Sequence, residues 1–155
     1  MTQRPLKILI IDDSAGDRFL IRAAFVAFQN SSFTEVETAI DAIEILDQDF
    51  DCIFLDLYLP GVKAFSLLKQ IREIKPDTPL ILCTGTQDMQ VARDVIQAGA
   101  DAYLSKILLS PDSVNRVLKR AFEASSSRKQ LKWFRKEIQD LRAELSEFQE
   151  PELEE

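Results

Sequence analysis

The stretch Cys52-Ile53-Phe54-Leu55-Asp56-Leu57 is an apolar run interrupted by a single carboxylate. Its apolar residues are consecutive rather than alternating with polar ones, which is typical of a strand buried on both faces of a parallel sheet. Comparable runs cover Ile8–Ile11 and Leu80–Cys83, and shorter apolar stretches surround Val36 and cover Ala102–Leu104. The segments between them have helical periodicity, with strand starts expected near residues 7, 34, 52, 79 and 102. Five βα units of similar length predict an α/β fold with a doubly wound, five-stranded parallel sheet.

The start of the last helix is indicated by Ser110-Pro111-Asp112, which supplies an N-cap, a proline at the first helical position and an acidic first turn. This helix is expected to complete one domain, residues 1–124. Residues 125–155 are expected to form a long helical extension with an acidic tail at 150–155.

The extension carries a heptad pattern. It begins with Ser125-Ser126-Ser127, interpreted either as a hinge or as three poor helix formers. The apolar a and d positions are Leu131, Phe134, Ile138, Leu141, Leu145 and Phe148. In this register Glu137 is a g residue and Arg142 the following e residue, and the two attract each other across a parallel dimer. We therefore expect a homodimer through a C-terminal coiled coil, and the alternative is a helix folded back on its own domain.

The composition excludes several classes of function. The 155 residues carry 19 Lys and Arg against 26 Asp and Glu, a net charge of −7, which argues against direct nucleic-acid binding. There is no histidine, which excludes His-based acid–base catalysis, Ser-His-Asp nucleophiles and the common zinc sites. Cys52 and Cys83 lie in apolar runs and are expected to be reduced core residues. No run approaches the roughly 18 apolar residues of a membrane span, so we expect a cytoplasmic protein without membrane attachment.

Polar side chains follow the predicted strands at one edge of the sheet, where folds of this class bind their ligands. Asp12 and Asp13 follow the first strand, Asp56 ends the third, Thr84 ends the fourth and Lys106 follows the fifth. In the strand order 2-1-3-4-5 the first and third strands are neighbours, so three carboxylates converge. Each ionised pair about 4 Å apart would cost roughly 4 kcal/mol, and the cation best suited to all-oxygen ligands is Mg²⁺. With Lys106 and Thr84, this edge could cradle a phosphoryl group, and one carboxylate could be its acceptor.

Five motifs in this order resemble those of response-regulator receiver domains of two-component signalling, over about residues 6–124. They are Ile10-Ile11-Asp12-Asp13-Ser14, Leu55-Asp56-Leu57-Tyr58-Leu59-Pro60-Gly61, Cys83-Thr84-Gly85, Gly99-Ala100-Asp101-Ala102-Tyr103-Leu104, and Lys106. The resemblance implies a flavodoxin-like fold. It also implies that the chain accepts a phosphoryl group from a histidine kinase or phosphotransfer protein and is not an enzyme, beyond slow self-phosphorylation and self-dephosphorylation.

The resemblance also implies roles for individual residues. Asp56 would be the phospho-acceptor, with Lys106 and Thr84 contacting the phosphoryl group. Tyr103 would be a switch residue that turns inward after Thr84. Asp12, Asp13, Asp56 and the backbone carbonyl of Tyr58 would hold Mg²⁺.

One residue departs from the family pattern, since Ile107 stands where a proline usually follows the lysine in a cis peptide. A cis bond before Ile107 would cost about 2.5–4 kcal/mol. We therefore expect a trans bond and an altered loop at 107–110, with Leu108 and Leu109 exposed.

Three functions are open at this point. The main interpretation is a phosphorylation-controlled regulator that signals to an unknown downstream protein through protein–protein contacts. The second is the receiver and linker helix of a longer regulator whose output domain is absent from this chain. The third belongs to another class, a small Mg²⁺-dependent phosphate-handling enzyme on the same fold.

Overall fold

The computed structural model describes residues 4–148, so the predicted acidic tail at 150–155 lies outside the described residues. Five parallel strands form one sheet in the order β2-β1-β3-β4-β5, which confirms the predicted fold and strand order. Their bounds are β1 Lys7–Ile11, β2 Ser32–Val36, β3 Cys52–Asp56, β4 Leu80–Thr84 and β5 Ala102–Ser105. Strand β2 begins two residues before the expected start at 34, and β4 begins one residue after 79.

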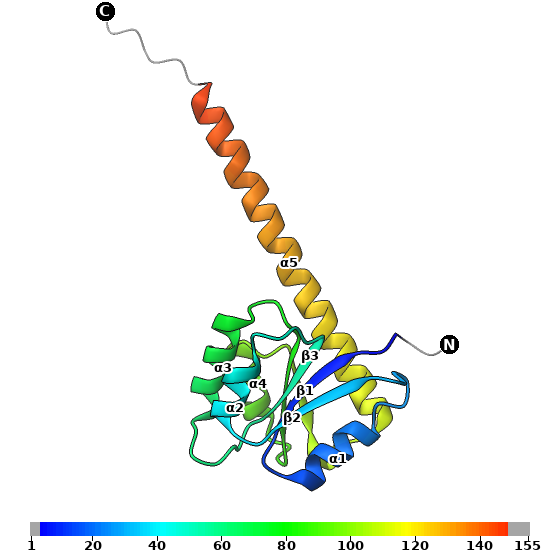
Figure 1. The fold of residues 1–155 in the computed structure, drawn as a ribbon. Helices are drawn as coiled ribbons and strands as arrows, with labels where there is room; N and C mark the ends of the chain where they lie inside the picture. Colours follow the sequence, from blue (N-terminus) through cyan, green and yellow to red (C-terminus); the bar gives the residue numbers. More distant parts are fainter. Residues whose placement is uncertain (1–3, 149–155) are drawn as a thin grey trace, which may run out of the picture.

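Helices cover both faces of the sheet (Figure 1). Helices α1 and α5 lie on one face, and α2, α3 and α4 lie on the other. Their bounds are α1 Ala15–Ala23, α2 Ala39–Ile45, α3 Ala64–Ile74, α4 Met89–Gln97 and α5 Pro111–Glu147, with a short 3₁₀ turn, η1, at Lys106–Leu108.

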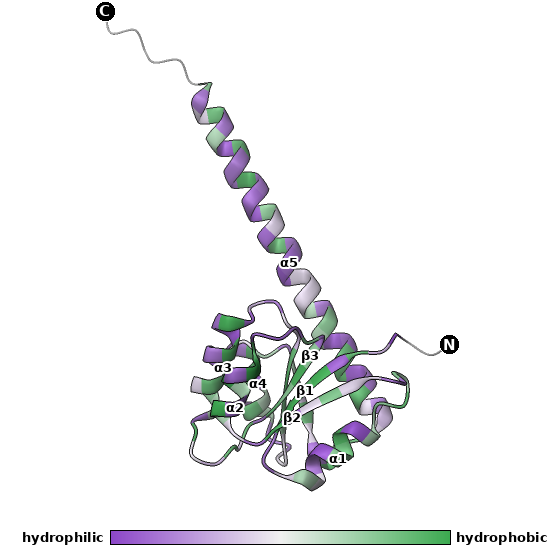
Figure 2. Ribbon diagram, viewed as in Figure 1, coloured by the Kyte–Doolittle hydropathy of each residue, from purple (hydrophilic) through white to green (hydrophobic). Residues whose placement is uncertain are grey.

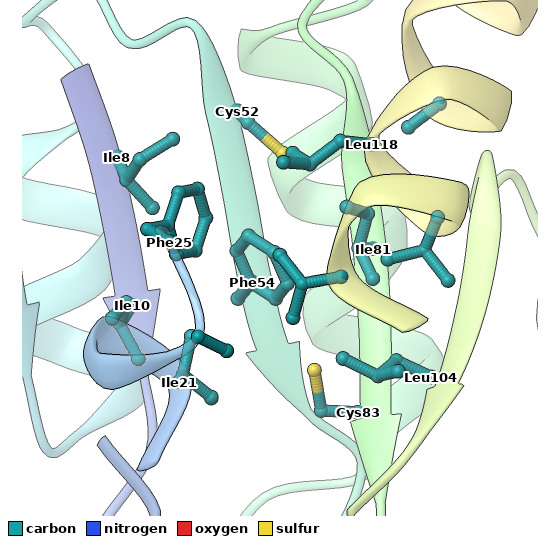
Figure 3. Close-up of a cluster of buried hydrophobic side chains, with 14 of the residues drawn as sticks. Ile8, Ile10, Ile21, Phe25, Cys52, Phe54, Ile81, Cys83, Leu104 and Leu118 are labelled. Atoms are coloured by element: carbon teal, nitrogen blue, oxygen red, sulfur yellow. The ribbon is translucent and has the colours of Figure 1, made fainter. Parts of the chain in front are cut away.

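The core is divided by the sheet into two apolar clusters, because successive side chains of a strand point to opposite faces. Ile8 and Ile10 pack on the side of α1 and α5, whereas Leu9 and Ile11 pack on the side of α2, α3 and α4. Figure 3 shows the first cluster, in which the ring of Phe54 packs against that of Phe25 with centroids 5.7 Å apart. Every residue of β3 and β4 is buried, and this burial on both faces explains the consecutive apolar runs.

Both cysteines lie in the first cluster. Cys52 and Cys83 are buried free thiols, as expected from the sequence. Burial raises the pKa of both thiols, because a thiolate would lose its hydration there. They therefore act as small apolar residues of the core.

Helix α5 is one continuous helix of 37 residues that leaves the domain and projects away from it (Figure 1). Ser110 caps its N-terminus in a capping box with Ser113, and Pro111 is its first residue, as predicted. The Ser125–Ser127 segment is helical, and the buried Ser125 hydroxyl donates to the carbonyl of Asp77. The structure therefore shows no hinge there, and the folded-back arrangement is not the one observed.

The projecting part of α5 is amphipathic but unpaired in a single copy of the chain. All six predicted heptad residues from Leu131 to Phe148 are exposed, the least exposed being Ile138 at 49%. Apolar residues recur among polar ones along this segment (Figure 2). Between residues 4 and 148, no helix combines the length and apolar character that crossing a membrane requires.

Candidate functional site

Three aspartates meet at the carboxyl edge of β1 and β3. Asp12 and Asp13 follow the last residue of β1, and Asp56 is the last residue of β3. Each offers one carboxylate oxygen, and these three oxygens lie within 4.8 Å of one another. Asp12 and Asp56 are buried, and Asp13 is exposed. The predicted convergence of carboxylates is therefore present in the structure.

Lys106, directly after β5, reaches into this cluster. Its Nζ lies 2.7 Å from Asp12 Oδ2 and 3.4 Å from Asp56 Oδ2. Burial lowers the pKa of Lys106, but the close contacts of its ammonium with the carboxylates of Asp12 and Asp17 outweigh this effect, and the pKa lies above its usual range. The ammonium is therefore charged at neutral pH and compensates part of the cluster's negative charge.

Asp12 is the most deeply buried carboxylate of the site, with a side chain 1% exposed. Burial raises its pKa, against the opposing effect of the Lys106 ammonium, and the charge of Asp56 raises it further. Its Oδ1 accepts a hydrogen bond of 2.9 Å from the backbone N–H of Ser14. Its Oδ2 is buried and receives no well-directed hydrogen bond from the described residues, only the close approach of Lys106. This oxygen can therefore serve as a ligand for a cation.

Thr84 lies at the end of β4, next to the cluster. It is fully buried, and its Oγ1 accepts a long hydrogen bond of 3.4 Å from the backbone N–H of Thr86. A Cβ at Gly85 would meet no atom within 4 Å, so the backbone directly after Thr84 borders open space.

Tyr103 is half-buried on β5 and contacts the loop after β4. Its hydroxyl donates a hydrogen bond to the backbone carbonyl of Thr86. Burial raises the pKa of this phenol, so it stays a neutral donor at physiological pH. The side chain of Tyr103 is thus connected, through Thr86, to the segment that begins at Thr84.

Tyr58 lies two residues after Asp56. Its backbone N–H donates a 3.1 Å hydrogen bond to Asp56 Oδ1, and its side chain is 62% exposed. This bond orients the Asp56 carboxylate. The other Asp56 oxygen, Oδ2, faces Lys106.

The loop after Lys106 agrees with the prediction of a trans peptide bond but not with the predicted exposure of Leu109. None of the peptide bonds in the described segment is cis, so the bond before Ile107 is trans, as predicted. Ile107 and Leu108 are exposed within the 3₁₀ turn η1. Leu109, however, is only partly exposed and packs against the core beneath α1 and α5. The prediction that Leu109 is exposed was therefore wrong, because the short turn directs the chain back onto the sheet before α5 begins.

Sequence reasoning missed Asp17 as a member of the site. Its Oδ2 lies 2.8 Å from Lys106 Nζ, and it belongs to the first turn of α1. An acidic residue in a first helical turn ordinarily needs no further explanation, because it favours the helix dipole. The available signal was the position of this turn, which directly follows the strand that carries Asp12 and Asp13.

Comparison with known proteins gives consistent matches. A family model for the response regulator receiver domain matches residues 8–119. The transcriptional regulatory protein ResD of Bacillus subtilis (strain 168) is 35% identical over 123 residues, which are 77% of this chain and 50% of ResD. The chemotaxis protein CheY of the same organism is 29% identical over 113 residues, which are 72% of this chain and 91% of CheY.

Solved structures show the same fold. The receiver domain of NtrX from Brucella abortus has a TM-score of 0.66 at 26% identity, with 75% of this chain and 98% of that chain covered. A CheY-like receiver domain protein from Methanospirillum hungatei JF-1 has a TM-score of 0.67 at 22% identity, with 80% of this chain and 98% of that chain covered. The chain spans half of ResD and 26% of DctD from Rhizobium meliloti (strain 1021), so it corresponds to one part of such longer regulators.

Proposed function

The chain belongs to the family of response regulator receiver domains of two-component systems, and we propose that it accepts a phosphoryl group on Asp56 from the phosphohistidine of a kinase or phosphotransfer protein. The observation that supports this most strongly is the position of Asp56. Its carboxylate is 7% exposed, shares a site with Asp12 and Asp13, and has one oxygen 3.4 Å from Lys106 Nζ.

The transfer requires that an Asp56 carboxylate oxygen attack the phosphorus atom of the donor. The new O–P bond forms while the donor's P–N bond breaks, and its electron pair leaves with the imidazole nitrogen. Oδ2 is the proposed nucleophile, because Oδ1 already accepts the N–H of Tyr58. Lys106 would compensate charge on the phosphoryl oxygens, and the Thr84 hydroxyl would donate a hydrogen bond to one of them.

The same edge is suited to Mg²⁺. Its protein ligands would be oxygens of Asp12, Asp13 and Asp56 with the backbone carbonyl of Tyr58. Two observations support this assignment: the close set of three carboxylate oxygens, and the buried Asp12 Oδ2, whose near neighbour is the Lys106 ammonium and which accepts no well-directed hydrogen bond from the described residues. When bound, Mg²⁺ supplies positive charge that offsets both the carboxylate repulsion and the charge of the incoming phosphoryl group.

We propose that the output is a change in protein–protein contacts. Once the phosphoryl group draws Thr84 toward Asp56, the Thr86 carbonyl that holds the Tyr103 hydroxyl would shift. Tyr103 would then turn inward and alter the surface of β5 and its neighbours, including the exposed Ile107 and Leu108. We also propose that the protein is cytoplasmic, where a histidine kinase donates its phosphoryl group. A further part of the proposal is that the chain does not contact nucleic acid directly.

We further propose that α5 pairs two copies of the chain as a parallel coiled coil. The exposed a and d residues cannot be buried by a lone helix that projects from its domain, so they need a partner surface. In this register the e positions include Arg135 and Arg142, and the g positions include Glu137 and Glu144. A parallel pair brings g next to e and joins Glu137 to Arg142. An antiparallel pair would bring e next to e and g next to g, so like charges would meet.

A longer regulator is the second arrangement compatible with these features. In that case α5 would be the linker helix that joins the receiver to an output domain. The relatives of which this chain spans half or less support this alternative.

Incubation with acetyl phosphate and Mg²⁺ tests the proposed function and separates it from a phosphate-handling enzyme. A receiver forms at most one stable acyl phosphate per chain and releases phosphate slowly. An enzyme would release many equivalents of phosphate per chain within minutes, and rapid multiple turnover would contradict the proposal.

A further inference from the structure

Lys106 has a third carboxylate partner besides the aspartates at the ends of β1 and β3. Its Nζ lies 2.8 Å from Asp17 Oδ2 and 3.4 Å from Asp56 Oδ2. The side chain of Lys106 is 15% exposed and that of Asp17 is 37% exposed, so this contact lies at the rim of the site. In the unphosphorylated protein Lys106 is thus held more closely by Asp17 than by the proposed acceptor.

The local structure of α1 leaves the Asp17 carboxylate available for this contact. Asp17 is the third residue of α1, where an acidic side chain often accepts the backbone N–H of the N-cap residue. Here the N-cap is Ser14, and its N–H donates to Asp12 Oδ1 instead. The carboxylate of Asp17 therefore has no partner within its own helix turn and pairs with Lys106 from the other side of the cluster.

We propose that Asp17 is a positioning residue that tethers Lys106 in the unphosphorylated protein and competes with the phosphoryl group for its ammonium. This inference rests on the proposed function of Asp56. When Asp56 carries a phosphoryl group, Lys106 must move from Asp17 toward the phosphoryl oxygens. Removal of the Asp17 carboxylate therefore favours the phosphorylated form, because the ammonium loses a competing partner.

The contact between Asp17 and Lys106 has the opposite effect on Mg²⁺: it disfavours the phosphorylated form but favours Mg²⁺ binding. Asp12, Asp17 and Asp56 share one ammonium. Without Asp17, the ammonium pairs with Asp12 and Asp56 alone and competes more strongly for the oxygens that would hold the cation. Loss of Asp17 thus weakens Mg²⁺ binding and prolongs the life of the acyl phosphate. General damage to the site would impair both.

The test compares Asp17→Asn with a matched control, Asp41→Asn. Asp41 is the third residue of α2, and its backbone N–H donates to the N-cap Thr38 just as that of Asp17 donates to Ser14. Among the described residues, Asp41 makes no ion pair. The control therefore removes the same charge from an equivalent helix position without touching Lys106.

Two quantities are measured on the full chain. Titration calorimetry of the unphosphorylated protein gives the Mg²⁺ affinity, and phosphate release at saturating Mg²⁺ gives the half-life of the acyl phosphate. For Asp17→Asn we expect an affinity about two- to fivefold weaker and a half-life about two- to fivefold longer, the range for a partly exposed ion pair. Asp41→Asn should match the wild type in both.

The tether is refuted if Asp17→Asn behaves like Asp41→Asn, or if affinity and half-life change in the same direction. The calorimetric measurement requires no phosphorylation, so an unchanged Mg²⁺ affinity would overturn the tether by itself. If the wild type were not phosphorylated, the proposed function would be contradicted. The calorimetric test of Asp17 would still be valid, because it is made on the unphosphorylated protein.

Discussion

The guanidinium of Arg128 donates hydrogen bonds to both carboxylate oxygens of Asp101, and so joins the extension of α5 to the residue before β5. The side chain of Asp101 is 2% exposed and also accepts hydrogen bonds from Arg72 of α3 and from the backbone N–H of Leu80. Lys132 lies 2.7 Å from Asp77 in the loop between α3 and β4. The first two turns beyond residue 124 are therefore connected to the domain by these polar contacts, although most of their side chains are exposed.

This network predicts unequal effects on stability. Asp101→Asn leaves two guanidinium groups without their buried counter-charge, and should lower the free energy of unfolding by about 3 kcal/mol. Arg128→Gln leaves Asp101 paired with Arg72 and should cost about 1 kcal/mol. Urea unfolding measures both, with Lys136→Gln, an exposed cation further along α5, as a control expected to change stability by less than about 0.5 kcal/mol. Equal losses for the Asp101 and Arg128 variants would contradict this account of the network.

The carboxylate cluster predicts a response to Mg²⁺. At a concentration about 100 times its dissociation constant, Mg²⁺ should add about 2.7 kcal/mol to the free energy of unfolding and raise the melting temperature. Asp13→Ala should melt above the wild type in EDTA, because one repelling charge is removed, and should lose most of the Mg²⁺ response. Differential scanning calorimetry in EDTA and in Mg²⁺ measures this.

The control for that experiment is Asp47→Ala. Asp47 is an exposed carboxylate that precedes β3, at the opposite edge of the sheet. It should leave both the melting temperature in EDTA and the Mg²⁺ response unchanged. A wild type indifferent to millimolar Mg²⁺ would show that the metal assignment is wrong.

The raised pKa of Asp12 predicts how Mg²⁺ affinity depends on pH. Burial is the main cause of the shift, and a protonated carboxyl does not bind the cation. The affinity should therefore fall as pH is lowered from 7, beginning above the range expected for an aspartate with the ordinary pKa of about 3.9. Between the unfolded-state pKa and the raised folded-state pKa, the folded protein binds the proton more readily. In that window the contribution of Asp12 to the stability of the metal-free protein should increase as pH falls.

Titration calorimetry at a series of pH values between about 4.5 and 8 checks this, with stability in EDTA followed by urea unfolding. A Mg²⁺ affinity that stays constant down to the lowest pH would be incompatible with Asp12 as a ligand.

The coiled-coil proposal predicts that two substitutions on the seam, the row of a and d residues from Leu131 to Phe148, convert the dimer to a monomer. Ile138→Asp together with Leu141→Asp places charges at an a and a d position and should give a monomer in sedimentation analysis. The matched control is Gln139→Asp with Ala143→Asp, which puts the same charges on the same turns but off the seam, and should stay dimeric. A wild type that sediments as a monomer at tens of micromolar would refute the coil. A dimer that survives the seam substitutions would place the interface on the receiver.

The orientation of the coil has its own test. Glu137→Arg and Arg142→Glu should each weaken the dimer, because each places like charges opposite one another in a parallel pair. The two changes together should restore it. If the double variant is no stronger than the single ones, the helices are not parallel in this register.

Much of the fold was predictable because its strands are buried on both faces. Consecutive apolar residues such as those of Cys52–Asp56 have few alternatives to a central strand, and their polar ends then meet at one edge. The position of β2 was less predictable, since Ser32–Val36 lies at the edge of the sheet and none of its residues is fully buried. The continuity of α5 through Ser125 depends on a hydrogen bond to Asp77, 48 residues away, which no local pattern indicates.

The parts of the site that lie at strand ends could be predicted from the sequence. Contacts between side chains of different elements could not. The meeting of Asp12, Asp13 and Asp56 follows from strand order alone. The contact of Asp17 with Lys106 joins residues 89 positions apart and depends on which partner the N–H of Ser14 selects. The partial burial of Leu109 likewise depends on the 3₁₀ turn Lys106–Leu108 before it. This turn could not be predicted from the family pattern, because the sequence departs from that pattern at Ile107.

The central claim, that Asp56 is the phospho-acceptor, is tested most directly by intact-protein and peptide mass spectrometry after incubation with acetyl phosphate and Mg²⁺. We predict a single addition of about 80 Da, the mass of one phosphoryl unit, on the peptide that contains Asp56. The addition should be absent from a folded Asp56→Asn variant. An unmodified wild type, or an addition that persists in Asp56→Asn or maps to another residue, would contradict the claim.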